Sequence, residues 1–119
     1  MQKIKFEYYD FPEFLKFLDS LQPRDSAKLI EIISKVEKFG LEISKRQKWI
    51  KKIDKNLYEI RSINSKNIQR VLYFKILNNK FIITHGFTKK TQKTPKYEIT
   101  KSKTRRDNYL KRRKNSGNA

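Results

Sequence analysis

The chain has no cysteine among its 119 residues. This absence excludes a disulfide scaffold, a thiolate zinc site and a cysteine nucleophile. The chain has one histidine, His85, and its 12 acidic residues are scattered along the sequence instead of forming a ligand cluster. We therefore expect neither a bound metal nor a cofactor.

Long apolar runs are missing as well. No run approaches the roughly 20 residues that are needed to span a bilayer. The N-terminus alternates charged and apolar residues, which is not the pattern of a signal peptide. We expect a protein of the reducing cytoplasm that does not work at a membrane.

Acidic residues are few in comparison with basic ones. Lys and Arg number 30 against 12 Asp and Glu, which gives a formal net charge of +18. This balance predicts a polyanionic partner, and charge alone would be satisfied by RNA, DNA, an anionic membrane or an acidic protein. Hydrophobic residues make up 36% of the chain, which is enough to build the core of a single domain.

The first third of the chain shows a strand pattern followed by two helix patterns. The segment Lys3–Tyr8 alternates polar and apolar residues, which is the period of a half-buried strand. Asp10, with Glu13 three residues later, has the spacing of a capping box at the start of a first helix. Pro23 suits the first turn of a second helix, and Gly40 is placed to end that helix.

Three further strands are predicted at Asn56–Ser62, Ile68–Leu77 and Phe81–Phe87. Asn78-Asn79 between the last two signals a tight turn, and short connections imply antiparallel pairing. The segment 41–55 is basic and weakly periodic, and no element is predicted there. We expect an α/β domain of the α+β kind, in which two N-terminal helices pack on one face of a mainly antiparallel, twisted sheet.

A basic third helix is predicted to follow the strands. Thr94 is typical of a helix cap and Pro95 of a first helical turn. From Thr88 onward the chain has 12 basic and two acidic residues, with few apolar positions. The predicted organisation is a domain at 1–95, a basic helical extension of that domain at 96–114 and a disordered tail at 115–119.

Arg70 is the first candidate for chemistry. Alternation in its predicted strand places it on one face with Ile68, Leu72 and Phe74, where an arginine is costly without a partner. One interpretation is that the planar guanidinium holds a phosphate or a transition state. The other is an ion pair with Glu59 on a neighbouring strand, and the two interpretations are compatible.

Arg61 and His85 are the next candidates. Arg61 lies near a strand end, where it is either an RNA contact or a solvated edge residue. Alternation places His85 on one face with Phe81, Ile83 and Phe87. Its pKa near neutrality suits proton transfer, and the alternative is a core histidine whose hydrogen bonds are satisfied.

A basic loop follows the last predicted strand. Lys89, Lys90 and Lys93 would neutralise a phosphate and stabilise a pentacoordinate centre, or else form a solvated face. Tyr97 is a candidate for stacking on a base. In the third helix, the alternatives are a solvated surface, docking onto a protein partner, or phosphate contacts that position RNA and carry little sequence information. The candidates for those phosphate contacts are Lys101, Arg105, Arg106, Arg112 and Arg113.

Three stretches together resemble a known family. They are Leu57-Tyr58-Glu59-Ile60-Arg61, then Arg70-Val71-Leu72-Tyr73-Phe74, then His85-Gly86-Phe87 with Lys89-Lys90-Thr91-Gln92-Lys93-Thr94-Pro95. In this order they are similar to the HigB toxins of the phage-derived type, which belong to the RelE superfamily. The resemblance covers roughly Lys3 to Arg106.

The resemblance implies a compact α/β toxin that cleaves mRNA, commonly on the translating ribosome. It implies metal-independent cleavage, in which the ribose 2′-hydroxyl attacks the adjacent phosphate and leaves a cyclic phosphate and a 5′-hydroxyl. It also implies a cognate HigA-like antitoxin of the helix-turn-helix type. The alternative function is that of a non-enzymatic nucleic-acid-binding module.

The same resemblance implies roles for individual residues. The arginine before Val-Leu-Tyr is Arg70, which would stabilise the transition state. Arg61 closes the Leu-Tyr-Glu-Ile strand and would bind the phosphate, while Lys89 and Lys90 would supply positive potential and proton transfer. The family often has tyrosine before the strand arginine, and this chain has Gln69 there.

Overall fold

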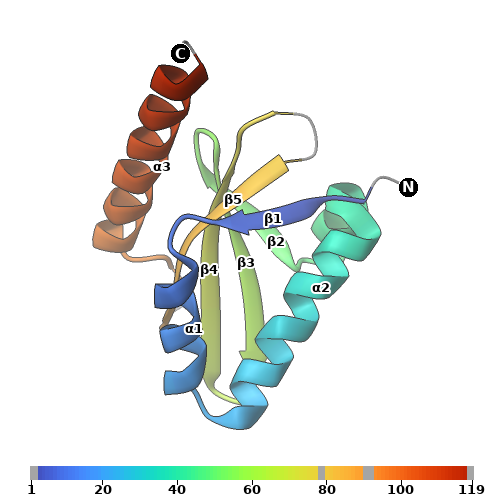
Figure 1. Cartoon of the computed structure of the whole chain (residues 1–119). Coiled ribbons are helices and arrows are strands. Elements are labelled where there is room, and N and C mark those ends of the chain that lie inside the picture. Colours follow the sequence, from blue (N-terminus) through green and yellow to red (C-terminus); the bar gives the residue numbers. More distant parts are fainter. Residues whose placement is uncertain (1–2, 78–79, 90–92, 118–119) are drawn as a thin grey trace.

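The computed structural model of the chain describes residues 3–77, 80–89 and 93–117 (Figure 1). Its helices and strands follow one another as β1 (Lys5–Tyr8), α1 (Phe11–Ser20), α2 (Pro23–Arg46), β2 (Ile50–Asp54), β3 (Leu57–Asn64), β4 (Asn67–Lys75), β5 (Lys80–Thr88) and α3 (Lys96–Gly117). The expected α+β architecture is confirmed. No helix in the described part of the chain is both long enough and apolar enough to cross a membrane.

The strands form one sheet in the order β1-β5-β4-β3-β2. Neighbouring strands from β2 to β5 pair antiparallel, as the short connections predicted, and β1 pairs parallel with β5 at the edge. The expectation of a mainly antiparallel sheet is therefore confirmed. The Asn78-Asn79 turn between β4 and β5 lies outside the described residues.

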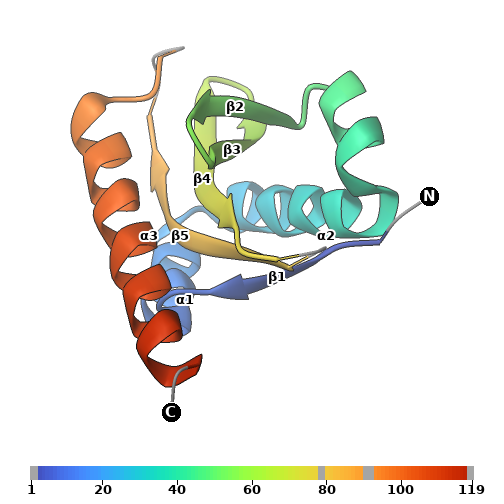
Figure 2. The ribbon, with the colours of Figure 1, turned by 90° about the horizontal axis from the view of Figure 1, so that it is seen from above.

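Helices cover both faces of this sheet. Side chains of α1 and α2 form the main core with one face of the sheet, and its members include Phe14, Leu29, Val36, Tyr73 and Ile83. The other face meets α3, where the Phe74 and Tyr109 rings lie 5.7 Å apart edge to face. Figure 2 shows α3 running beside β5, well away from α2. We call these the α2 face and the α3 face.

A bulge in β5 reverses the face on which His85 lies. The register passes from Tyr73 opposite Ile83 to Leu72 opposite His85, so that Thr84 is the extra residue. A bulge shifts the alternation of side chains by one position. Ile83 therefore joins the core with α2, whereas His85 contacts α3. The predicted face shared by His85 and Ile83 is wrong for this reason.

The signals at the helix ends were correct in part. The Asp10 side chain accepts a hydrogen bond from the Glu13 backbone N–H at 3.0 Å, as an N-cap should. The Glu13 carboxylate is bound by Arg105, so it does not serve the reciprocal bond of a capping box. Gly40, with φ at 82°, kinks α2, which continues to Arg46. Gly40 therefore ends the first helical segment, as predicted, because its φ of 82° and ψ of 176° are not helical angles, and a second helical segment follows it within the bounds of α2.

The strand β2 and the end of α3 also differ from expectation. Ile50 of β2 pairs with Ile60, and the two lysines that follow it are exposed. An edge strand with exposed lysines has no clear apolar alternation, which explains why the segment 41–55 showed no element. The helix α3 continues to Gly117, so the predicted tail at 115–119 begins inside this helix, and 118–119 lie outside the described residues.

Candidate active site

Two arginines and one glutamate meet on the α3 face. Arg61 of β3 lies opposite Arg70 of β4 in the strand register, and Glu59 lies two residues before Arg61 on the same face. One carboxylate oxygen of Glu59 is 3.2 Å from Arg61 Nε, and the other is 3.6 Å from Arg70 Nη1. We call Glu59, Arg61, Arg70 and Thr94 the arginine–glutamate group.

Thr94 joins this group from the segment that leads into α3. Its hydroxyl donates a hydrogen bond to Glu59 Oε2 and accepts one from Arg70 Nη1 at 3.1 Å. The hydroxyl of Thr94, which was predicted to cap the helix, thus connects the segment before α3 to the two central strands. The backbone N–H groups of Glu98 and Ile99 donate to the Pro95 carbonyl oxygen, so the helix begins at Lys96, one residue later than predicted.

The two arginines differ in how deeply they are buried. The Arg70 and Glu59 side chains have no exposed area, while the Arg61 side chain is 21% exposed. Burial lowers the pKa of Arg70, and the Glu59 carboxylate opposes this shift. Since the ordinary pKa of arginine lies far above neutrality, Arg70 keeps its charge at neutral pH. A buried charge requires a partner, and Glu59 is that partner in this structure.

Sequence reasoning considered Glu59 only as an ion-pair partner for Arg70. The ion pair exists, so that interpretation of Arg70 is confirmed. The structure adds that one carboxylate contacts both arginines and the Thr94 hydroxyl. The sequence did contain one indication of the contact between Glu59 and Arg61. The two residues are two positions apart in a predicted strand, so their side chains lie next to each other on one face.

His85 forms a second polar cluster beneath α3. Its Nε2 lies 2.9 Å from Glu98 Oε1, and its Nδ1 lies 3.1 Å from the Thr84 hydroxyl, which is 2.6 Å from the Ser102 hydroxyl. Because an ionised carboxylate only accepts hydrogen bonds, we assign the ring proton to Nε2. Burial lowers the pKa of His85, against the opposing effect of its hydrogen bond with Glu98. His85 is thus a buried, hydrogen-bonded histidine on the same sheet face as Arg70.

The basic loop and the first turn of α3 are less buried. The Lys89 backbone N–H donates to the Ile68 carbonyl oxygen at 3.0 Å, which ties the start of the loop to β4. Lys93 is exposed, and Tyr97 is 65% exposed, so its ring is accessible for stacking. Lys90 lies outside the described residues.

Arg105, predicted as an RNA contact, is engaged within the protein. Its two Nη atoms donate to the two Glu13 carboxylate oxygens at 2.9 and 2.8 Å, and Nη1 also donates to the Thr84 carbonyl oxygen. The guanidinium carbon lies 5.0 Å from the centre of the Tyr9 ring. These contacts attach the middle of α3 to α1 and β5.

Other basic side chains of α3 contact the domain as well. Arg106 donates to the Lys55 carbonyl oxygen at 2.8 Å, and Arg112 donates to the Tyr9 hydroxyl at 2.9 Å. Lys101 lies 4.0 Å from a Glu13 carboxylate oxygen. Arg113 is exposed near the end of the helix. The basic residues of α3 therefore divide into some that attach the helix and some that face solvent.

Metal ligands do not gather anywhere in the described ranges. No group of three or more His, Cys, Asp or Glu side chains in residues 3–77, 80–89 and 93–117 could hold a metal ion. The groups assembled on the α3 face are guanidinium, carboxylate, hydroxyl and imidazole. Their chemistry is anion binding and proton transfer.

The fold and these clusters define a small α+β protein with a cationic centre between its sheet and its C-terminal helix. The model of the family described as "Phage derived protein Gp49-like (DUF891)" matches residues 16–107, and the chain belongs to this family. The family is toxin-like and is related to the RelE toxins of toxin–antitoxin systems. A comparison with curated proteins found no match. The matched segment contains every member of the arginine–glutamate group.

Proposed function

We propose that this protein is the HigB-like toxin of a type II toxin–antitoxin system, an endoribonuclease that cleaves mRNA on the translating ribosome without a metal. The observation that carries the proposal is the arginine–glutamate group, in which Arg61 and Arg70 share one carboxylate on one face of the sheet. The toxin-like family and the net charge of +18 support the same conclusion. The proposed inhibitor is a HigA-like antitoxin of the helix-turn-helix type.

The arginines would hold the phosphate that is attacked. Arg61 has the exposed end of the group, so an RNA phosphate would meet it first. Arg70 would then exchange its contacts with Glu59 and Thr94 for the phosphate oxygens. A planar guanidinium can bind two of these oxygens at once and stabilise the added negative charge of the transition state.

Cleavage also needs a proton acceptor and a proton donor. The 2′-oxygen forms a bond to phosphorus as its proton leaves, and the bond from phosphorus to the 5′-oxygen breaks as that oxygen gains a proton. Glu59, once released by the arginines, would accept the first proton, with His85 as the second candidate. Lys89 or Lys90 would donate the second proton. Lys93 and Tyr97 would hold the neighbouring nucleotides.

Inducible expression in a bacterium tests the proposal. Expression of the wild-type chain should stop growth and cleave translated messages, and co-expression of the proposed antitoxin should restore growth. The cleaved RNA should carry 5′-hydroxyl ends, and a chelator should not change cleavage once the ribosome's own magnesium requirement is met. Intact messages at verified soluble expression would contradict the proposal, and 5′-phosphate ends would exclude attack by the 2′-hydroxyl.

A second candidate function is a nucleic-acid-binding module without catalysis. The exposed basic end of α3 favours it, since Lys111, Arg113 and Lys114 all face solvent. The two functions differ in their response to Arg70→Ala. A nuclease would lose cleavage with this variant and keep most of its RNA affinity. A binding module would show no cleavage in either form, and its affinity would fall only when charge is removed from an exposed surface, in proportion to the charge removed.

A further inference from the structure

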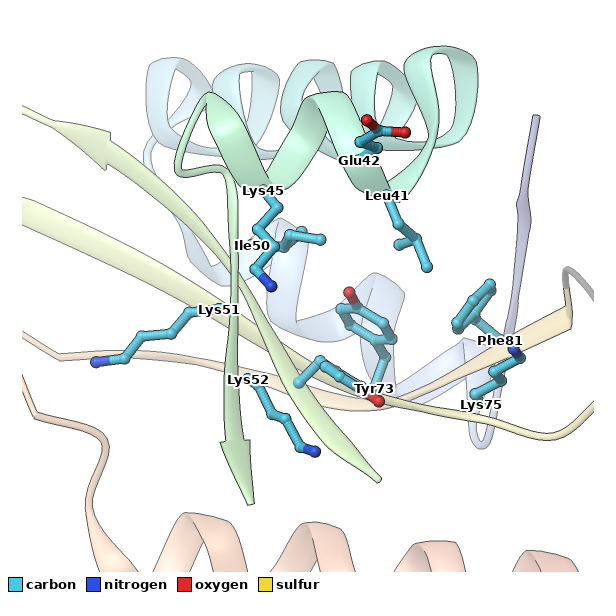
Figure 3. A pocket seen from close by; sticks show the side chains of 10 residues that line it. Leu41, Glu42, Lys45, Ile50, Lys51, Lys52, Tyr73, Lys75 and Phe81 are labelled. Atoms are coloured by element: carbon cyan, nitrogen blue, oxygen red, sulfur yellow. The ribbon is translucent and has the colours of Figure 1, made fainter. Parts of the chain in front are cut away.

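A hollow of about 390 Å³ lies on the α2 face, which is the face of the sheet opposite Arg70. It opens between the last turns of α2, the strand β2 and the ends of β4 and β5 (Figure 3). Its floor and walls are apolar and aromatic. They are formed by Leu41, Ile50, Tyr58, Tyr73 and Phe81.

Three lysines surround this apolar floor. Lys45 comes from α2, Lys52 from β2 and Lys75 from the end of β4. All three are exposed, and none is in an ion pair with another described residue. Figure 3 shows the charged end of Lys51 and the carboxylate of Glu42 pointing away from the hollow. We call this feature the lysine-rimmed hollow.

The shape of the hollow favours a protein side chain over a nucleic-acid base. Stacking of a base needs an exposed ring face. Tyr73 and Phe81 are each only 1% exposed, and one face of the partly buried Tyr58 ring is stacked on Tyr73 with the ring centres 5.3 Å apart. An apolar cavity with convergent charges at its edge is the form in which proteins receive an anchor side chain from an amphipathic segment. Lysines at the edge would attract carboxylates on that segment and increase the rate of encounter.

We propose that the lysine-rimmed hollow is the docking site for an acidic, amphipathic segment of a protein partner. An apolar side chain of the segment packs against the partly exposed side chains of Leu41, Ile50 and Tyr58, and the carboxylates of the segment face the three lysines. Because the hollow and Arg61 lie on opposite faces of the sheet, a segment bound there leaves the exposed end of the arginine–glutamate group uncovered. Identification of this partner with an antitoxin rests on the proposed function, and the docking site itself does not.

Binding of synthetic peptides to the full chain tests the site without any assumption about toxicity. The probe is a labelled peptide of about 15 residues, long enough for a helix, with leucines at helical spacing and glutamates elsewhere. A second peptide keeps the glutamates and has serine in place of each leucine. Fluorescence anisotropy measures the affinity of both peptides, and of a single-stranded RNA, for each variant.

The first variant neutralises the rim with Lys45→Gln, Lys52→Gln and Lys75→Gln. A matched control removes the same charge from exposed lysines elsewhere, with Lys16→Gln, Lys28→Gln and Lys66→Gln. The rim variant should bind the leucine peptide about tenfold more weakly than the matched control does, which corresponds to about 1.4 kcal/mol. Affinity for RNA should fall equally in both triple variants.

The second variant places a carboxylate in the wall of the hollow with Leu41→Asp. Its control is Ile30→Asp, at an exposed apolar position of the same helix. Only Leu41→Asp should abolish the preference for the leucine peptide over the serine peptide. Thermal unfolding of each variant verifies that it is folded.

Three results would overturn the docking site. The wild type could bind the leucine and serine peptides equally, which would mean that the hollow receives no apolar side chain. The two triple variants could lose affinity for the leucine peptide equally, which would mean that only the overall charge of the protein determines binding. The rim variant could lose RNA affinity selectively while its peptide affinity is unchanged, which would make the hollow an RNA surface.

Discussion

Replacement of Arg105 by alanine should destabilise the protein more than any other single change among the basic residues of α3. The side chain binds both Glu13 oxygens, the Thr84 carbonyl oxygen and the Tyr9 ring. Arg105 is 18% and Glu13 40% exposed, so solvent screens their attraction. The sequence predicted that Arg105 contacts RNA, whereas in the structure Arg105 attaches α3 to α1 and β5.

The size of the effect follows from these contacts. A partly exposed ion pair contributes up to about 1 kcal/mol, a hydrogen bond to a carbonyl oxygen about 1 kcal/mol, and the contact of a cation with an exposed ring about 0.5–1 kcal/mol. The sum is about 2–3 kcal/mol. At about 2.1 cal/mol/K per residue, the unfolding entropy of 119 residues is about 0.25 kcal/mol/K, which gives a fall in melting temperature of about 8–12 °C.

Thermal unfolding monitored by circular dichroism measures this fall, and Arg113→Ala is the matched control. It removes the same charge from an exposed position near the end of the same helix, so its melting temperature should stay within about 2 °C of wild type. A cycle with Glu13→Gln should show that about 1 kcal/mol of the effect is shared by the pair. Equal melting temperatures for the two alanine variants would refute the structural role of Arg105.

The pH dependence gives an independent test. The hydrogen bonds from Arg105 lower the pKa of Glu13 below its ordinary value of 4.5. A carboxylate whose pKa is lowered by folding stabilises the protein above its unfolded pKa, and this contribution is lost as the pH falls through the folded pKa. The difference in unfolding free energy between wild type and Arg105→Ala should therefore become smaller below about pH 4.5. The contacts of Arg105 with Thr84 and Tyr9 do not depend on the Glu13 carboxylate, so this difference should stay above zero.

Other predictions concern catalysis, the buried histidine and the end of α3. Arg70→Ala should lower cleavage in a reconstituted translation assay by about 10²–10³-fold while leaving RNA affinity within a few-fold; cleavage at the wild-type rate would exclude a catalytic role. Burial lowers the pKa of His85, so the unfolded chain binds its proton first, and the protein should lose stability as the pH falls below about 6.5. His85→Asn should flatten this part of the curve of unfolding free energy against pH, and an unchanged slope would show that folding does not shift the pKa of His85. Neutralising Lys111, Arg113 and Lys114 together should make ribosome binding less sensitive to salt. The slope of log affinity against log salt concentration should fall by about 0.7–0.9 for each phosphate that these side chains neutralise in the wild type. Cleavage positions should stay the same, because phosphate contacts carry little sequence information.

Local signals in the sequence identified most elements of the fold. The strands β3, β4 and β5 were predicted to within two residues at most of their ends, because their alternation and their turn residues are local properties. The start of α2 at Pro23 and the N-cap at Asp10 were predicted for the same reason. The strand β2 was missed, since Lys51 and Lys52 are exposed at an edge and leave no apolar pattern.

The candidate site was predicted less completely than the fold. The arginines were identified because a lone cation on an apolar strand face signals a partner, and Arg70 does have one. The shared role of Glu59 depends on the register that sets Arg61 opposite Arg70, which no local pattern states. The face on which His85 lies depends on a bulge at Thr84. The sequence could not predict this bulge, because the alternation of residue types continues through it without a visible break.

By itself, the sequence determined the α+β class, the basic character and the two arginines on strand faces, because composition and residue period act over a few neighbours. Only the tertiary structure decided which residues meet. Arg105 binds Glu13 across 92 positions of the chain, and Thr94 reaches Glu59 across 35. Such contacts depend on which elements pack together and on the register between strands. A basic helix that sequence alone assigns to a nucleic acid is therefore, in part, attached to its own domain.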